Sequence, residues 1–293
     1  MADVRDVSTL QVRSTMAVVS EPTLCWVIRT DDGLLVEPVR EFVAEMAANG
    51  TSPATRRSYC HDLLRWLRFC EAIETTWDRA STEDVRDFVR WLRAAPNSQR
   101  VRSGKESRPP AGSVNAATGK TYLREGYSPR TINHALSVLS AFYTYMYETG
   151  RGPWSPVPAR QRRRDHLPTR RVRYRQKVPI FQPRSVTEAA LKDLFEVLRH
   201  DRDRALVAVA LSSGVRAGEL LSMTTRGVDA GQGVFAIEPK GGLGSRIWVP
   251  AAPESFVWIA RYLAQRPSVS GDGPLWLTPR PPHQPLNYFA LRQ

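Results

Sequence analysis

A chain of 293 residues is long enough for two domains, and its 42% of hydrophobic residues can supply a buried core for each. The 42 Lys and Arg residues outnumber the 29 Asp and Glu residues, and the resulting charge of +13 favours a polyanionic partner, most often nucleic acid. A basic protein without such a partner is the alternative. The cysteines Cys25, Cys60 and Cys70 have neither disulfide nor zinc spacing, so we expect a cytoplasmic protein without a bound metal. No stretch has the length of a membrane span or the pattern of a signal peptide, so we expect no membrane partner.

The first part of the chain predicts an arm followed by a helical domain. Residues 1–36 are weakly patterned and predict either a loosely ordered arm or a short strand pair around Asp32-Gly33. Residues 37–150 then predict a domain of four helices, interrupted by a loop or insert over 96–127. Ser52, Ser81 and Ser128 are the expected N-caps of the second, third and fourth helices, and Asn49-Gly50 is the expected end of the first.

Residues 151–184 predict a basic linker. Ten of its residues between 159 and 184 are basic and one is acidic, and residues 151–184 contain six prolines, which is typical of an extended charged segment. Such a segment commonly binds nucleic acid, and for that role we single out Arg162, Arg163 and Arg164. A solvated spacer without a binding role is the alternative.

Residues 185–293 predict a mixed α+β domain. Ser185 and Glu188 have the spacing of a capping box that would open its first helix. Further helices are expected over DRALVAVALSSG, after Arg216 and around Phe256, and GVFAIEP and SRIWVP predict two strands joined by KGGLG. PLWLTP predicts a short strand, and PLNYFALRQ predicts the start of another helix.

Two helices of the first domain present candidate faces for DNA. At 100° per residue, the second helix places a cationic row opposite its apolar face, with Leu64 intruding on the basic side. The row consists of Arg57, His61, Arg65 and Arg68. The fourth helix places small polar groups opposite its core stripe, which suits contacts to phosphates or base edges. That face consists of Arg130, Asn133, His134, Ser137 and Ser140. The alternative for the cationic row of the second helix is an ordinary solvated face. The alternative for the polar face of the fourth helix is packing on another polar surface.

Arg216 stands at an unusual place, because a cation at a helix N-terminus is repelled by the helix dipole. The position is favourable if the guanidinium binds an anion such as a phosphate, and Gly214 and Gly218 leave room for a bulky backbone. Lys240, on the glycine-rich turn, could neutralise a phosphate or protonate a leaving oxygen. The alternatives are a surface arginine paired with Glu219 and a solvated turn lysine.

The segment GVRAGELLSMTTRGVD, followed by a strand and by KGGLGSRIWVP, resembles the tyrosine recombinase (phage integrase) family, and SPRTINHALSVLSAFY resembles the last core-binding helix of that family. The resemblance covers about residues 37–293. It implies a mainly α protein, with a SAM-like helical core-binding domain and a mixed α+β catalytic domain. It assigns Arg216 as a phosphate clamp, Lys240 as proton donor to the leaving 5′ oxygen and Glu219 as a supporting residue. It also implies double-stranded DNA as partner, self-association on DNA for a full-length protein, and strand cleavage through a 3′-phosphotyrosine without metal, ATP or another cofactor.

The sequence departs from the family pattern after the hairpin. The family requires a His-x-x-Arg motif and then a nucleophilic Tyr, but no His-x-x-Arg occurs in the 293 residues, and Tyr288 matches the region ahead of that motif. Without a phenol to attack phosphorus, cleavage is not expected. We therefore expect a site-specific recombinase with an incomplete catalytic domain, cut short and inactive alone. A non-catalytic DNA-binding remnant or regulator that occupies a recombination site is the alternative, and an RNA- or membrane-surface-binding protein is less favoured.

Overall fold

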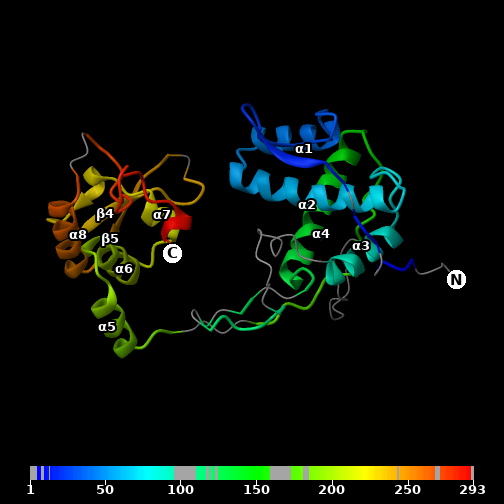
Figure 1. Ribbon diagram of the computed structural model, residues 1–293. Helices are drawn as coiled ribbons and strands as arrows, with labels where there is room; N and C mark the ends of the chain where they lie inside the picture. The colour runs from blue at the N-terminus through cyan, green and yellow to red at the C-terminus, as the bar shows by residue number, and fades with distance from the viewer. Residues whose placement is uncertain are drawn as a thin grey trace, which may run out of the picture. The chain divides into compact units, whose positions relative to one another are not determined.

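The computed structural model describes residues 5–7, 10–12, 14–95, 110–116, 119, 121–122, 125–158, 173–180, 185–242, 244–267 and 271–291. The chain divides into two compact units, Met1–Phe181 and Gln182–Gln293 (Figure 1). The division falls inside the predicted linker. The predicted domain boundaries at residues 36, 150 and 184 stay a prediction.

The described part of the first unit contains four helices, and the second, third and fourth begin where the capping signals predict. Ser52 caps α2 by accepting the Thr55 N–H, Ser81 forms a capping box with Asp84 at α3, and Ser128 caps α4. Pro53 and Pro129 occupy the first helical positions of α2 and α4, where a missing N–H costs nothing. The helices are α1 (Glu37–Ala48), α2 (Pro53–Ala72), α3 (Thr82–Ala94) and α4 (Pro129–Glu148).

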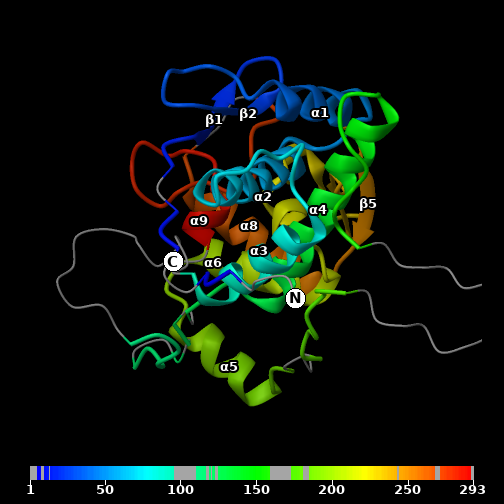
Figure 2. The same cartoon turned by 90° about the vertical axis from the view of Figure 1, so that its right-hand side faces the viewer.

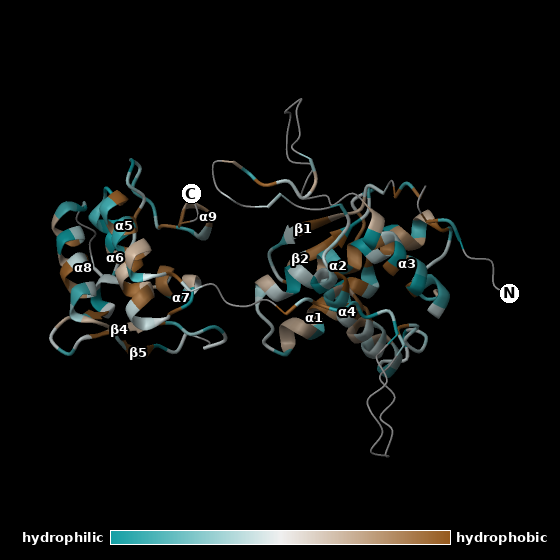
Figure 3. Ribbon diagram, turned by 90° about the horizontal axis from the view of Figure 1, so that it is seen from below, coloured by the Kyte–Doolittle hydropathy of each residue, from teal (hydrophilic) through white to brown (hydrophobic). Residues whose placement is uncertain are grey.

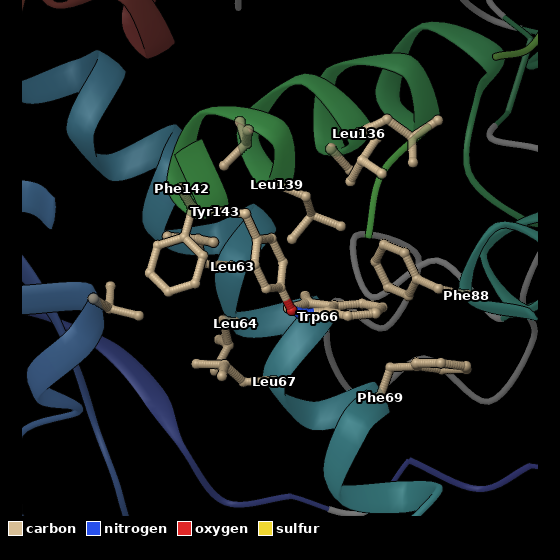
Figure 4. Packing of buried hydrophobic residues seen from close by; sticks show 14 of the residues in the cluster. Leu63, Leu64, Trp66, Leu67, Phe69, Phe88, Leu136, Leu139, Phe142 and Tyr143 are labelled. Carbon is tan, nitrogen blue, oxygen red and sulfur yellow. Dashed lines mark hydrogen bonds between the residues drawn. The ribbon is translucent and has the colours of Figure 1, made fainter. Parts of the chain in front are cut away.

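The core of the first unit lies between α2 and α4 and is closed by α1 and α3. Figure 4 shows the leucine and aromatic side chains of α2 facing those of α4, with Phe88 of α3 beside them. Trp66 and Tyr143 are both fully buried, and the Trp66 Nε1–H donates to the Tyr143 hydroxyl at 3.0 Å. This pairing satisfies the indole donor, which would otherwise be left without a partner in an apolar core.

A hairpin of β1 (Ala17–Glu21) and β2 (Cys25–Arg29) packs on α1 and α2, on the side shown in Figure 2. The strand pair was one of the two predicted forms of this region, but its turn lies at residues 22–24, and Asp32-Gly33 forms a second turn after β2. β2 is apolar, as its colour in Figure 3 shows, and Val27 and Ile28 are buried. Leu64 is 7% exposed and belongs to the core cluster of the first unit, although it lies on the predicted basic side of α2.

The second unit is a small sheet flanked by helices. Its strands pair antiparallel in the order β3-β4-β5, and the predicted hairpin is the β4–β5 pair, with Phe235 opposite Val249. The elements are α5 (Glu188–Val197), α6 (Asp201–Ser213), α7 (Ala217–Leu221), η2 (Thr225–Gly227), β3 (Val228–Asp229), β4 (Val234–Ile237), β5 (Ile247–Pro250), α8 (Pro253–Gln265) and α9 (Tyr288–Leu291). With four helices in the first unit and these short strands in the second, the fold is mainly α.

Two local predictions for the second unit are wrong. The capping box at Ser185 does not form, because α5 begins at Glu188 and Thr187 is its N-cap, accepting the Ala190 N–H at 3.3 Å. The predicted strand at 274–279 is reduced to isolated bridges, in which Pro274 pairs with Thr224 and Leu277 with Pro285. Proline interrupts the ladder at each bridge, because it has no N–H to donate.

Candidate nucleic-acid interface and phosphate-binding cations

Arg216 is presented by the sharp turn between α6 and α7. α6 ends at Gly214, whose φ of +65° is left-handed and suits glycine, and Arg216 is the N-cap of α7. A Cβ built on Gly214 or on Gly218 meets nothing within 4 Å, so the space on both sides of the arginine is open. The Arg216 side chain is 74% exposed, which leaves most of its donors accessible to a ligand.

A buried carboxylate holds Arg216 in place. Glu219 Oε2 accepts the Arg216 backbone N–H at 2.8 Å, and Oε1 accepts Nη1 of the same residue at 2.8 Å. These hydrogen bonds from the Arg216 backbone and guanidinium lower the pKa of Glu219 and outweigh the opposing effect of burial. The predicted ion pair with Glu219 therefore forms, and it fixes one edge of a guanidinium that remains largely exposed.

The same carboxylate brings Lys240 to the site. The Lys240 backbone N–H donates to Glu219 Oε1 at 3.4 Å, so the start of the glycine-rich turn is fastened beside Arg216. The Lys240 side chain itself is exposed. Glu219 thus joins two cations that are 24 residues apart in the sequence. The contact is made by the Lys240 backbone, and the side chains of Arg216 and Lys240 are both exposed and carry charges that suit a phosphate.

α7 packs on residues 274–279, the segment predicted as a strand. The Trp276 Nε1–H donates to the Leu220 carbonyl at 2.7 Å, and the Leu275 N–H donates to the Met223 carbonyl at 2.8 Å. Leu220, Met223, Leu275 and Trp276 are all buried. A five-residue helix is too short to be stable by itself, so this packing is what keeps Arg216 and Glu219 in register.

The predicted cationic row on α2 is mostly engaged within the first unit. Arg57 is exposed and lies over the Trp26 ring at 4.6 Å, while Arg68 is half-buried and donates to the Met16 carbonyl. Burial, followed by the charges of Arg57 and Arg65, lowers the pKa of His61, which favours its neutral form. The row therefore offers fewer accessible positive charges than helix periodicity alone indicates.

Asp62 connects the two candidate DNA faces. Its carboxylate is 3% exposed, accepts a hydrogen bond from Arg65 and lies 2.6 Å from Nδ1 of His134 on α4. Burial raises the pKa of Asp62, while Arg65 and His134 act in the opposite direction. Sequence reasoning missed this residue, although an aspartate next to an apolar stripe was a signal that a buried partner existed.

The predicted polar face of α4 contacts the chain that follows it. The Asn133 Nδ2 donates to the Gln176 carbonyl at 2.9 Å, and Oδ1 accepts the Gln176 N–H at 2.7 Å. The Ser137 hydroxyl accepts from Arg175 Nη2 at 2.7 Å, while Arg130 is exposed. The alternative of packing on another polar surface therefore holds for Asn133 and Ser137. Arg162, Arg163 and Arg164 lie outside the described residues.

Two further properties concern only the described part of the chain. None of its helices combines the length and apolar composition needed to cross a bilayer. It also contains no group of three or more His, Cys, Asp or Glu side chains arranged to hold a metal ion.

Comparison with known proteins places these features in a family. Residues 39–103 match the family described as phage integrase, N-terminal SAM-like domain. The chain is 24% identical over 217 residues to transposase A from transposon Tn554 of Staphylococcus aureus (strain Mu50 / ATCC 700699), covering 70% of this chain and 55% of that protein. It is 30% identical over 158 residues to the tyrosine recombinase XerD of Xanthomonas axonopodis pv. citri (strain 306), covering 52% of this chain and 47% of that protein.

A solved structure supports the fold. The integrase of transposon Tn1549, in complex with a circular intermediate DNA, aligns with a TM-score of 0.52 at 12% identity, covering 83% of this chain and 71% of that one. The architecture is that of the integrases and recombinases. The chain is similar to members of the tyrosine recombinase, or phage integrase, family, and the family match itself covers residues 39–103. It spans about half the length of the curated relatives it matches.

Proposed function

We propose that the chain is the DNA-recognition part of a site-specific recombinase of the tyrosine type, together with the first cations of its active site. The observation that carries the proposal is the joint placement of Arg216 and Lys240 by the Glu219 carboxylate. The family match to residues 39–103 and a net charge of +13 support duplex DNA as the substrate.

The proposed chemistry assigns a separate task to each cation. Arg216, held at one edge by Glu219, would present its remaining donors to the non-bridging oxygens of the scissile phosphate, where negative charge develops. Lys240, an exposed point charge on a mobile stem, would protonate the 5′ oxygen as it leaves. Attack by a tyrosine phenol would form the 3′-phosphotyrosine, and the 293 residues contain no His-x-x-Arg motif to accompany that step.

The chain by itself is therefore proposed to bind DNA without cleaving it. Charge stabilisation by several groups and an activated nucleophile are both needed for phosphoryl transfer, and Arg216 with Lys240 supplies only part of the first. A protein of this kind would act in the cytoplasm, where its free thiols are stable, and a full-length recombinase of this type would self-associate on DNA.

The test is to titrate a labelled DNA duplex with the protein at several salt concentrations and to measure binding by fluorescence anisotropy. Affinity should fall linearly on a log–log plot between about 50 and 200 mM salt, with a slope that counts the neutralised phosphates. Arg216→Ala should keep non-specific affinity within about twofold, because one phosphate contact among several is lost. An affinity that does not respond to salt would remove the proposal.

A second candidate, a regulator that occupies a recombination site without cleaving it, is favoured by the missing His-x-x-Arg motif. Both candidates predict that the chain alone does not cleave DNA, and a nicked suicide substrate, on which an active recombinase becomes covalently trapped, tests that shared expectation. A trapped adduct would show that the chain cleaves DNA and would exclude the regulator. Sequence-selective binding without an adduct supports a binding role for the isolated chain.

A further inference from the structure

Residues 173–177, a described part of the predicted basic linker, are held against the first unit. From residue 173 to residue 177, exposed and half-buried residues alternate, with Tyr174 and Gln176 turned toward the first unit. The three exposed positions are all cationic: Arg173, Arg175 and Lys177. Arg173 and Tyr174 lie in a turn, and the chain is free of turns from residue 175 to residue 180. Where successive residues of such a chain project to opposite sides, Arg175 and Lys177 lie on the side opposite to Gln176.

The inner side of the segment is held at several points. Both polar atoms of the Asn133 side chain pair with the backbone of Gln176, and the Gln176 Nε2 donates to the Tyr174 carbonyl at 2.6 Å. Tyr174 packs against the core of the first unit with a φ of +68°, a conformation that tyrosine rarely adopts. Such a backbone persists only where its surroundings impose it, which indicates a defined docking site.

The Asn133 amide is therefore poorly suited to read a base. Its donor and its acceptor are already paired, at 2.9 and 2.7 Å, and a base contact would require breaking both hydrogen bonds. Arg175 donates one guanidinium N–H to the Ser137 hydroxyl and is otherwise exposed, and Lys177 is exposed. Beside Arg175, a groove of about 460 Å³ runs along α4, lined by the hydroxyls of Ser137, Ser140 and Thr144.

We propose that Asn133 is a positioning residue, which locks the segment 173–177 against α4 so that Arg175 and Lys177 contact the phosphates of duplex DNA beside this helix. In an extended chain the Cα atoms of these two residues are roughly 6.5 Å apart, which is close to the rise of two nucleotides, about 3.4 Å each, along the DNA helix axis. This inference rests on the proposed function, because it specifies where the DNA backbone is held.

The contact by which Asn133 holds the segment 173–177 against α4, called the lock below, is tested first without DNA. Hydrogen exchange at the Gln176 amide, followed by mass spectrometry, should be slow in the wild-type protein, since this N–H donates to Asn133. Asn133→Ala should accelerate it about 5- to 10-fold, the effect of losing one hydrogen bond. Asn49→Ala, which removes an exposed side-chain hydrogen bond at the end of α1, is the matched control and should leave that amide unchanged. Fast exchange at Gln176 in the wild type would overturn the lock, whether or not the protein binds DNA.

The role in DNA binding is tested by a double-mutant cycle. Asn133→Ala should weaken duplex binding about 3- to 10-fold and reduce the salt slope by about 1 to 2, since each lost phosphate contact contributes about 0.9. The same substitution should have no further effect in the Arg175→Ala, Lys177→Ala background. A loss that persists undiminished in that background, with an unchanged slope, would mean that Asn133 contacts DNA itself and would overturn the proposal.

A second variant breaks the lock from the other side. Gln176→Pro removes the N–H that Asn133 accepts, keeps the Asn133 side chain intact, and restricts Arg175 to the extended region. The lock predicts the same loss of affinity and slope as Asn133→Ala. Wild-type affinity in Gln176→Pro would overturn it. If the wild-type protein shows no salt-dependent DNA binding at all, the proposed function fails, and the exchange experiment still decides whether the lock exists.

Discussion

The backbone N–H of Lys240 donates to Oε1 of Glu219 at 3.4 Å, although the two residues belong to different elements of the second unit. The same oxygen also accepts Nη1 of Arg216 at 2.8 Å. One buried carboxylate therefore sets the relative position of both candidate phosphate-binding cations. Loss of its charge should loosen the site as a whole rather than one side chain.

Glu219→Gln should lower stability at neutral pH, because the ionised carboxylate accepts hydrogen bonds from Arg216 and Lys240. Since the pKa of Glu219 is lowered in the folded protein, its contribution is present above the ordinary Glu pKa of about 4.3 and is lost as pH falls through the lowered value. Thermal unfolding of wild type and variant from neutral to acidic pH should give melting temperatures that converge on acidification. A difference that grows on acidification would contradict this role.

Asp62→Ala should destabilise the first unit by about 1–3 kcal/mol, since it removes the buried acceptor shared by Arg65 and His134. Urea denaturation measures the loss. Asp31→Ala, at an exposed position, is the control and should change the unfolding free energy by less than about 0.5 kcal/mol. Equal effects of the two substitutions would show that the Asp62 cluster adds no stability.

The helices of the first unit could be predicted from the sequence because their start signals are local. Ser52-Pro53 and Ser128-Pro129 place a capping hydroxyl and a proline at the first turn, and both helices begin there. At α5, two candidate caps compete only two residues apart, and the hydroxyl of Thr187, not that of Ser185, bonds the free helix N–H. A local pattern cannot separate such neighbours.

The part of the candidate site that could be predicted from the sequence is the part whose residues lie close together in the chain. Arg216 and Glu219 are three residues apart, so helix geometry already favours their ion pair. The contact between Asn133 and Gln176 joins a side chain to a backbone 43 residues away, and such a contact leaves no periodic trace in the sequence. For the same reason, the sequence left two alternatives for the polar face of α4, contact with DNA and packing on another polar surface, and part of this face contacts residues 175–176 of the predicted linker.

Tyr143→Phe should cost about 1–3 kcal/mol of unfolding free energy. The phenol accepts from Trp66 and donates to the Trp77 carbonyl, and the substitution leaves the buried Trp66 N–H without a partner (Figure 4). Urea denaturation monitored by tryptophan fluorescence reports on this core directly. Tyr147→Phe, at a side chain that is 49% exposed, should be nearly neutral. A neutral Tyr143→Phe would mean that the hydroxyl contributes nothing beyond packing.

Substitutions at Gly214 and Gly218 should change the unfolding free energy in opposite directions, although both residues flank Arg216. Neither position crowds an added Cβ, so backbone conformation decides the outcome. Gly214 has a φ of +65°, and Gly214→Ala should destabilise the second unit by about 1 kcal/mol. Gly218 lies within α7, where Gly218→Ala should stabilise by about 0.5–1 kcal/mol through helix propensity. Thermal and urea unfolding of both variants measure the difference, and a loss of similar size at both positions would show that steric contact, rather than the left-handed turn, governs how Arg216 is presented.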